Sequence, residues 1–177
     1  MTFNPIALQH LFDETLFRNI EKGTPVVETM TVSTSTEAPQ SAVIAATEEF
    51  IYKGDKSSGI LFILRYSDFP YFSPRAEDAF EKTLQAIGLD PARVAIVNLD
   101  NAHNPNDWGH IMRFFNPVKI TLLGVEPRSL NLPEIVHNTF MKGKKATVFH
   151  TFSFEEMFAD VEKKKSFWYQ FRDFLKK

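Results

Sequence analysis

The stretch ILFILRYSDFPYFSP, residues 60–74, passes from one type of secondary structure to another. Its first five residues are all apolar, as expected of a β-strand that is buried on both faces of a parallel sheet. At its other end, Ser73 and Pro74 suit the N-cap and the first position of a helix. Between these parts lies a loop that is rich in aromatic residues and contains one carboxylate, Asp68. The order of strand, loop and helix indicates an α/β unit.

The same alternation continues toward the C-terminus. Apolar runs predict strands at 60–64, 94–99, 119–124 and 145–150. Amphipathic segments predict a helix between Ser73 and Gly88, one from the Asn104–Asp107 cap to Asn116, a short one from Ser153 to about Asp160, and a last one at about 163–176. Residues 53–59 and 125–140 are predicted to be loops, and 42–52 is ambiguous between helix and strand. This pattern predicts a three-layer α/β/α sandwich with a mostly parallel four-stranded sheet, and it leaves the strand order open.

The N-terminal part of the chain has a different character. Residues 1–22 carry apolar side chains at helical spacing, which predicts an N-terminal helical arm. Residues 23–41 are rich in Thr, Ser, Glu and Pro and have no periodic face, which predicts a flexible connector. We therefore expect the α/β/α domain to cover residues 42–177.

Composition excludes several classes of protein. The net charge of −2 argues against a broad basic face that coats nucleic acid, although a local basic patch stays compatible with it. The chain has no cysteine, which excludes disulfides, thiolate zinc sites and thiol nucleophiles. No apolar run approaches the ~20 residues of a membrane span, and no signal peptide is evident, so we expect a cytoplasmic protein without membrane contact. The 18 phenylalanines indicate an aromatic core, with stacking on bases or partners as the alternative.

Candidate functional residues lie where the predicted strands end, because ligands of open α/β sheets bind beyond the carboxyl ends of the strands. The four loops are 66–73, 100–106, 124–131 and 150–153. Neither a nucleotide-binding glycine motif nor a GxSxG motif is present, and no cofactor is indicated. His103 and His110 do not share a helix face and no HExxH occurs, so no metal site is predicted.

Acidic and basic side chains in these regions allow two interpretations each. Asp68 is a candidate general base beside aromatic rings, or a turn residue whose carboxylate accepts from the next backbone amides. Asp100 has the same two interpretations. The lysines at 142–145 and 163–165 are candidate phosphate contacts, or ordinary solvated surface.

The loop motifs resemble those of the uracil-DNA glycosylase-like superfamily, a parallel four-stranded α/β/α fold. Residues 66–72, YSDFPYF, are similar to the family's Gly-Gln-Asp-Pro-Tyr-His loop, and residues 150–153, HTFS, to its His-Pro-Ser-Pro loop. If the chain were a glycosylase, the resemblance implies that Asp68 would activate water and that His150 would stabilise the departing base. The binding residues that we expect in the four loops beyond the strand ends are Tyr66, Tyr71, Phe72, Asn101 and Ser153. The inserted Phe69, and Phe72 in place of the family's His, favour a shared fold over shared catalysis.

A second resemblance covers much of the same span. The helix end AIGLD (86–90), the strand that ends at Gly124 and the terminal KKKSFWYQF (163–171) are similar to the psi subunit of bacterial DNA polymerase III, a protein without catalytic activity. In that family an N-terminal arm binds a partner. The resemblance implies a binding protein in DNA replication or repair assemblies, with a protein partner on the N-terminal helix and weak DNA contact. The alternatives are that this helix packs on the domain, and that the chain is a glycosylase-type hydrolase.

Overall fold

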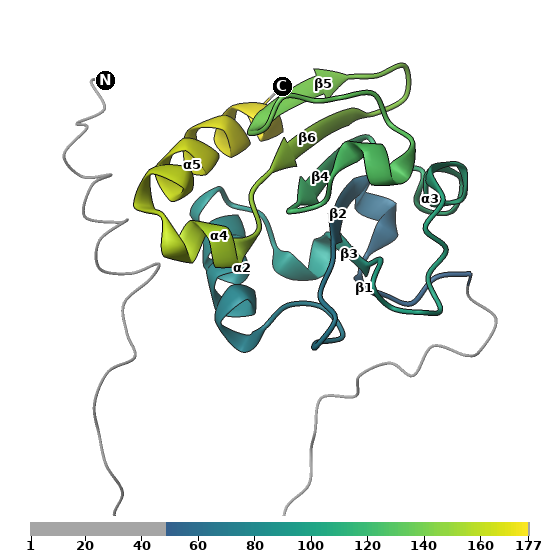
Figure 1. Ribbon diagram of the computed structural model, residues 1–177, viewed down its shortest axis with the longest axis horizontal. Helices are drawn as coiled ribbons and strands as arrows, with labels where there is room; N and C mark the ends of the chain where they lie inside the picture. Colours follow the sequence, from purple (N-terminus) through teal and green to yellow (C-terminus); the bar gives the residue numbers. More distant parts are fainter. Residues whose placement is uncertain (1–48, 177) are drawn as a thin grey trace, which may run out of the picture. The chain divides into compact units, whose positions relative to one another are not determined.

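The computed structural model describes residues 49–176, which form an α/β fold around one mixed sheet (Figure 1). The predicted arm at 1–22 and connector at 23–41 lie outside the described residues, as does the predicted domain start at 42. Among the helices that the structure describes, none has both the length and the apolar character that a bilayer span requires.

Within residues 49–176 the sheet has six strands, in the order β1-β3-β2-β4-β6-β5. Their bounds are β1 Tyr52–Gly54, β2 Ile60–Leu64, β3 Ala95–Asn98, β4 Lys119–Leu123, β5 Thr139–Lys142 and β6 Thr147–Thr151. The four inner strands are the predicted ones and pair in parallel. The two outer strands, β1 and β5, pair antiparallel to their neighbours, so the prediction of a mostly parallel four-stranded sheet was wrong in both number and type.

The two missed strands lie in segments that the sequence indicated to be irregular or ambiguous. Strand β1 has three residues and β5 has four, and among the described strands each has a neighbour on one side only. Short edge strands bury little side chain, so they lack the apolar run that identifies an inner strand. Gly54 ends β1 with φ of 89°, and a Cβ there would lie 1.9 Å from the carbonyl oxygen of Val94.

Four α-helices lie in the described part of the chain and match the predicted ones: α2 Pro74–Ala86, α3 Trp108–Phe115, α4 Phe154–Ala159 and α5 Val161–Lys176. Short 3₁₀ helices occur at η2 Lys56–Ser58, η3 Pro91–Arg93 and η4 Pro127–Leu130. Ser73 caps α2 by accepting from the Ala76 amide, as predicted. The predicted capping box between Ser153 and Glu156 opens α4.

The two faces of the sheet carry different side chains. Figure 1 shows α2, α4 and α5 on one face and α3 on the other. On the first face aromatic rings dominate: Phe62 of β2 lies 4.9 Å from Phe80 and 6.0 Å from Phe171, between ring centroids. On the second face the aliphatic residues of the inner strands pack against Ile111 and Phe115 of α3. The phenylalanines of these elements therefore serve the core, as their number in the sequence indicated.

Replacing Phe171 with Ala should lower the free energy of unfolding by about 3–5 kcal/mol, because the buried ring would leave a cavity beside Phe149 and Phe167. Tyr169→Ala on the same helix is the matched control. Tyr169 is 59% exposed, so its replacement should cost less than about 1 kcal/mol. Urea unfolding followed by circular dichroism measures both. Equal losses in the two variants would contradict the described orientation of α5.

Candidate functional site

The loops beyond the carboxyl ends of β2, β3 and β4 meet through Arg65. Its guanidinium follows β2 and donates to the carboxylate of Asp100 at 3.0 Å, in the loop after β3. It also donates to Asn106 at 3.0 Å and to Ser129 at 3.5 Å, the latter in the loop after β4. One side chain thus links three of the four loops that the sequence predicted to lie together. Since the Arg65–Asp100 pair is partly exposed, its role is to fix geometry more than to add stability.

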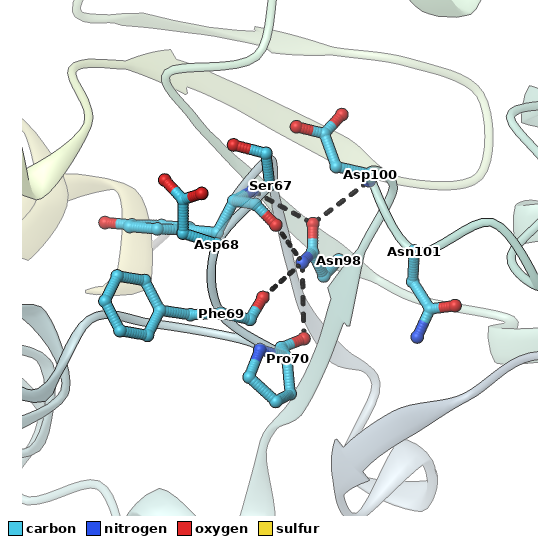
Figure 2. A pocket seen from close by; sticks show the side chains of 8 residues that line it. Ser67, Asp68, Phe69, Pro70, Asn98, Asp100 and Asn101 are labelled. Atoms are coloured by element: carbon cyan, nitrogen blue, oxygen red, sulfur yellow. Dashed lines mark hydrogen bonds between the residues drawn. The ribbon is translucent and has the colours of Figure 1, made fainter.

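The loop that follows β2 is held by hydrogen bonds to the side chain of Asn98, the last residue of β3. Its side chain is buried, with 2% of its surface exposed. The amide nitrogen Nδ2 donates to the carbonyls of Tyr66, Phe69 and Pro70 at 2.7, 3.0 and 3.2 Å. The oxygen Oδ1 accepts from the backbone amides of Tyr66 and Asp100, both at 3.0 Å (Figure 2). A single buried amide therefore satisfies the backbone of a loop that has no regular structure of its own.

An open polar pocket of about 260 Å³ lies over this loop. It is lined by Tyr66, Ser67, Asp68, Phe69, Pro70, Asn98, Asp100 and Asn101. Asp68 is exposed, and Figure 2 shows its carboxyl group pointing away from the Asn98 amide. Within residues 49–176 the Asp68 carboxylate forms neither a hydrogen bond nor an ion pair, so it does not make the bonds of a turn residue.

Tyr66 connects this loop to the start of α4. Its phenol donates to the carboxylate of Glu155, which also accepts from the hydroxyl of Ser73 at 2.9 Å. Burial and then the Glu155 bond raise the pKa of Tyr66 above its usual range. The phenol therefore stays protonated near neutral pH and can act as a donor but not as a base.

The other predicted binding residues have different positions. Phe72 is only 6% exposed and packs on Phe80 and Phe154, with ring centroids 4.8 and 5.8 Å away. Burial raises the pKa of Tyr71, the residue before it. The Oδ1 of Asn101, in the pocket wall, accepts from the backbone amide of His103 at 3.0 Å. Ser153 uses its hydroxyl and amide in the capping box of α4.

His150 is separate from this pocket. Its side chain is 3% exposed, and its strand partner Leu122 belongs to the core that faces α3. Its Nδ1 is 3.0 Å from the carbonyl oxygen of Ile135, and its ring centroid is 4.4 Å from that of His137. Burial and the neighbouring His150 lower the pKa of His137. The structure thus brings Tyr66, Asp68 and Asn101 together, while His150 contacts a different segment.

A groove of about 470 Å³ occurs at the opposite edge of the sheet, where β4 and β6 begin. It is lined by Val118, Lys119, Phe140, Lys142, Gly143, Lys144, Lys145, Ala146, Thr147 and Phe174, a set without any acidic residue. We call this feature the lysine groove. Lys142, Lys144 and Lys145 are exposed and form no salt bridge within residues 49–176, so their charges are uncompensated. Lys119 instead donates to the Phe174 carbonyl at 3.1 Å, and burial lowers its pKa.

The sequence analysis did not identify two side chains that hold the loops beyond the carboxyl ends of the strands, Asn98 and Arg65. Asn98 is the polar residue in the apolar run VAIVNL, and a polar residue at the end of a buried strand is the signal that could have identified it. Arg65 directly follows the run ILFIL, but nothing in its neighbours indicates that it contacts loops far along the chain.

No protein-family model matches the chain, and no curated protein is significantly similar to it in sequence. The resemblances to the glycosylase-like superfamily and to the psi subunit therefore remain hypotheses that rest on the motifs.

Asn98→Asp should destabilise the protein by about 2–4 kcal/mol at neutral pH, because a carboxylate would face three carbonyl oxygens without a hydrogen to donate. Asn101→Asp, in the same pocket wall but less buried, is the control and should cost less than about 1 kcal/mol. Asn98→Leu removes the acceptor Oδ1 as well, so hydrogen exchange at the Tyr66 and Asp100 amides should be faster in that variant than in Asn101→Asp. Unchanged exchange at both amides would show that Asn98 does not hold the loop.

Proposed function

We propose that this chain is a non-catalytic binding protein of DNA replication or repair assemblies, with a three-layer α/β/α fold like that of the glycosylase-like superfamily. The observation that carries the proposal is the separation of the two candidate catalytic groups. Asp68 lines an exposed pocket above Asn98, whereas His150 is buried and engaged with Ile135.

Hydrolysis of a glycosidic bond requires both groups at one ligand. A general base must come within hydrogen-bond distance of the attacking water, and the group that stabilises the leaving base must contact the same substrate. Misplacement by ~1 Å can already cost ~100-fold in rate. Asp68 and His150 share neither a pocket nor a hydrogen-bond partner in the described part of the chain, which supports binding over catalysis.

The lysine groove supports contact with nucleic acid. Three uncompensated ammonium groups lie beside the rings of Phe140 and Phe174, and phosphate oxygens attract such groups. Since the whole chain carries a net charge of −2, the attraction is local and strongly weakened by salt. This arrangement suits an accessory protein that touches DNA while a protein partner holds it in place. The predicted helix at 1–22 is the proposed attachment for that partner, and we propose that the protein acts in the cytoplasm.

Replacing Lys142, Lys144 and Lys145 together with Ala should weaken binding to a fluorescent single-stranded oligonucleotide at least ~10-fold at low salt. The slope of log affinity against log salt should fall by about 2, since each lost phosphate contact removes ~0.7. A matched triple variant replaces Lys53, Lys82 and Lys165, which all pair with a carboxylate. It changes the net charge equally and should bind like the unmodified chain. Fluorescence anisotropy measures both, and equal losses would remove the lysine groove from the proposal.

The second candidate, a glycosylase-type hydrolase, is favoured by one observation: the pocket beside Asp68 is also lined by Asn101, and a side-chain amide can hydrogen-bond the edge of a flipped base. Incubation with DNA that contains uracil or hypoxanthine distinguishes the two functions. We expect no base release from the unmodified chain. Base release that disappears in Asp68→Asn would overturn the non-catalytic function.

A further inference from the structure

Three potential metal ligands lie close together near the carboxyl ends of β4 and β6. Glu126 lies in the loop after β4, His137 lies shortly before β5, and His150 lies on β6. One ligand atom from each residue lies within 4.8 Å of the others. The three residues come from separate segments, so it is the fold that brings them together.

His150 has the orientation of a prepared metal ligand. A carbonyl oxygen can only accept, so the 3.0 Å contact with Ile135 places the ring hydrogen on Nδ1. The lone pair is then on Nε2, which forms no hydrogen bond within residues 49–176. A buried histidine whose one nitrogen donates to a backbone carbonyl while the other is unpaired is the arrangement that fixes the tautomer in metal sites.

The other two ligands are able to move toward a common ion. His137 and Glu126 are both exposed, and the His137 ring contacts the rings of His150 and Phe152, with centroids 4.4 and 4.3 Å away. Metal–ligand bonds of ~2.0–2.2 Å require ligand atoms about 3.3 Å apart in a tetrahedral site. The spacing of up to 4.8 Å therefore needs only side-chain rotation of the exposed pair around the fixed His150.

We propose that Glu126, His137 and His150 bind a divalent transition metal of the zinc class, with at least one coordination position open to water. Two imidazoles and one carboxylate form the ligand set of zinc sites that keep an open position, whereas Ca²⁺ and Mg²⁺ prefer oxygen ligands alone. The ion connects the loop after β4, the segment before β5 and β6 itself. The site is independent of the proposed DNA contact, because the lysine groove lies at the opposite edge of the sheet.

The test is calorimetric titration of the tag-free, chelator-treated full chain with zinc chloride. We expect one ion per chain with a Kd below about 10 μM. His137→Ala should weaken binding about 100-fold or more and Glu126→Gln about 10-fold. Both residues are exposed, so neither change should disturb folding, which circular dichroism verifies. With Co²⁺ in place of Zn²⁺, intense visible absorption should appear for the unmodified chain and be lost in His137→Ala.

Two control variants have the same chemistry elsewhere on the surface: His103→Ala and Glu134→Gln, both at exposed positions. They should bind zinc as the unmodified chain does. A chain that binds no zinc in this range overturns the proposal. So does binding that persists in His137→Ala, because the ion would then be held at another position.

Discussion

Burial of β2 on both faces and pairing of both its edges is the constraint on which the rest of the structure depends. Leu61 and Ile63 face the aliphatic layer beneath α3, while Phe62 faces the aromatic layer beneath α2 and α5. Because side chains alternate along a strand, a shift of one residue in its pairing would place Phe62 in the aliphatic layer and Leu61 and Ile63 in the aromatic one. The alternation of side chains in β2 therefore determines its register with β3 and β4, and with it the positions of the loops that follow these three strands.

The amino ends and the carboxyl ends of the parallel strands have different chemistry. We call these two sides of the sheet the amino edge and the carboxyl edge. The carboxyl edge carries amides, carboxylates and histidines. The loop after β2 is held there by two side chains: Asn98 donates to its backbone, and Glu155 accepts from the phenol of Tyr66. The amino edge carries lysines that no acidic group in the described part of the chain neutralises. The carboxyl edge is thus suited to a small, well-positioned ligand such as a metal ion, and the amino edge to an extended anionic one.

The elements that could be predicted from the sequence are those with local signals. Continuous apolar runs identified the four inner strands, and caps at Ser73 and Ser153 identified helix starts, since both signals lie within a few residues of the element. Strands β1 and β5 contain no buried residue, so neither has the continuous apolar run that identified the inner strands. The approach of Glu126 to His137 and His150 depends on how β4, β5 and β6 pair, so no spacing in the sequence could have revealed it.

The lysines at the β5–β6 hairpin have a consequence beyond any ligand. In the sheet formed by residues 49–176, β5 is an edge strand, and its outer hydrogen-bonding groups are a template on which a strand from another molecule could add. Lys142 on this strand, and Lys144 and Lys145 in the turn that follows, would face the same charges on an incoming copy. Repulsion between these ammonium groups disfavours the addition of a second copy to β5, and so the growth of fibrils from this strand.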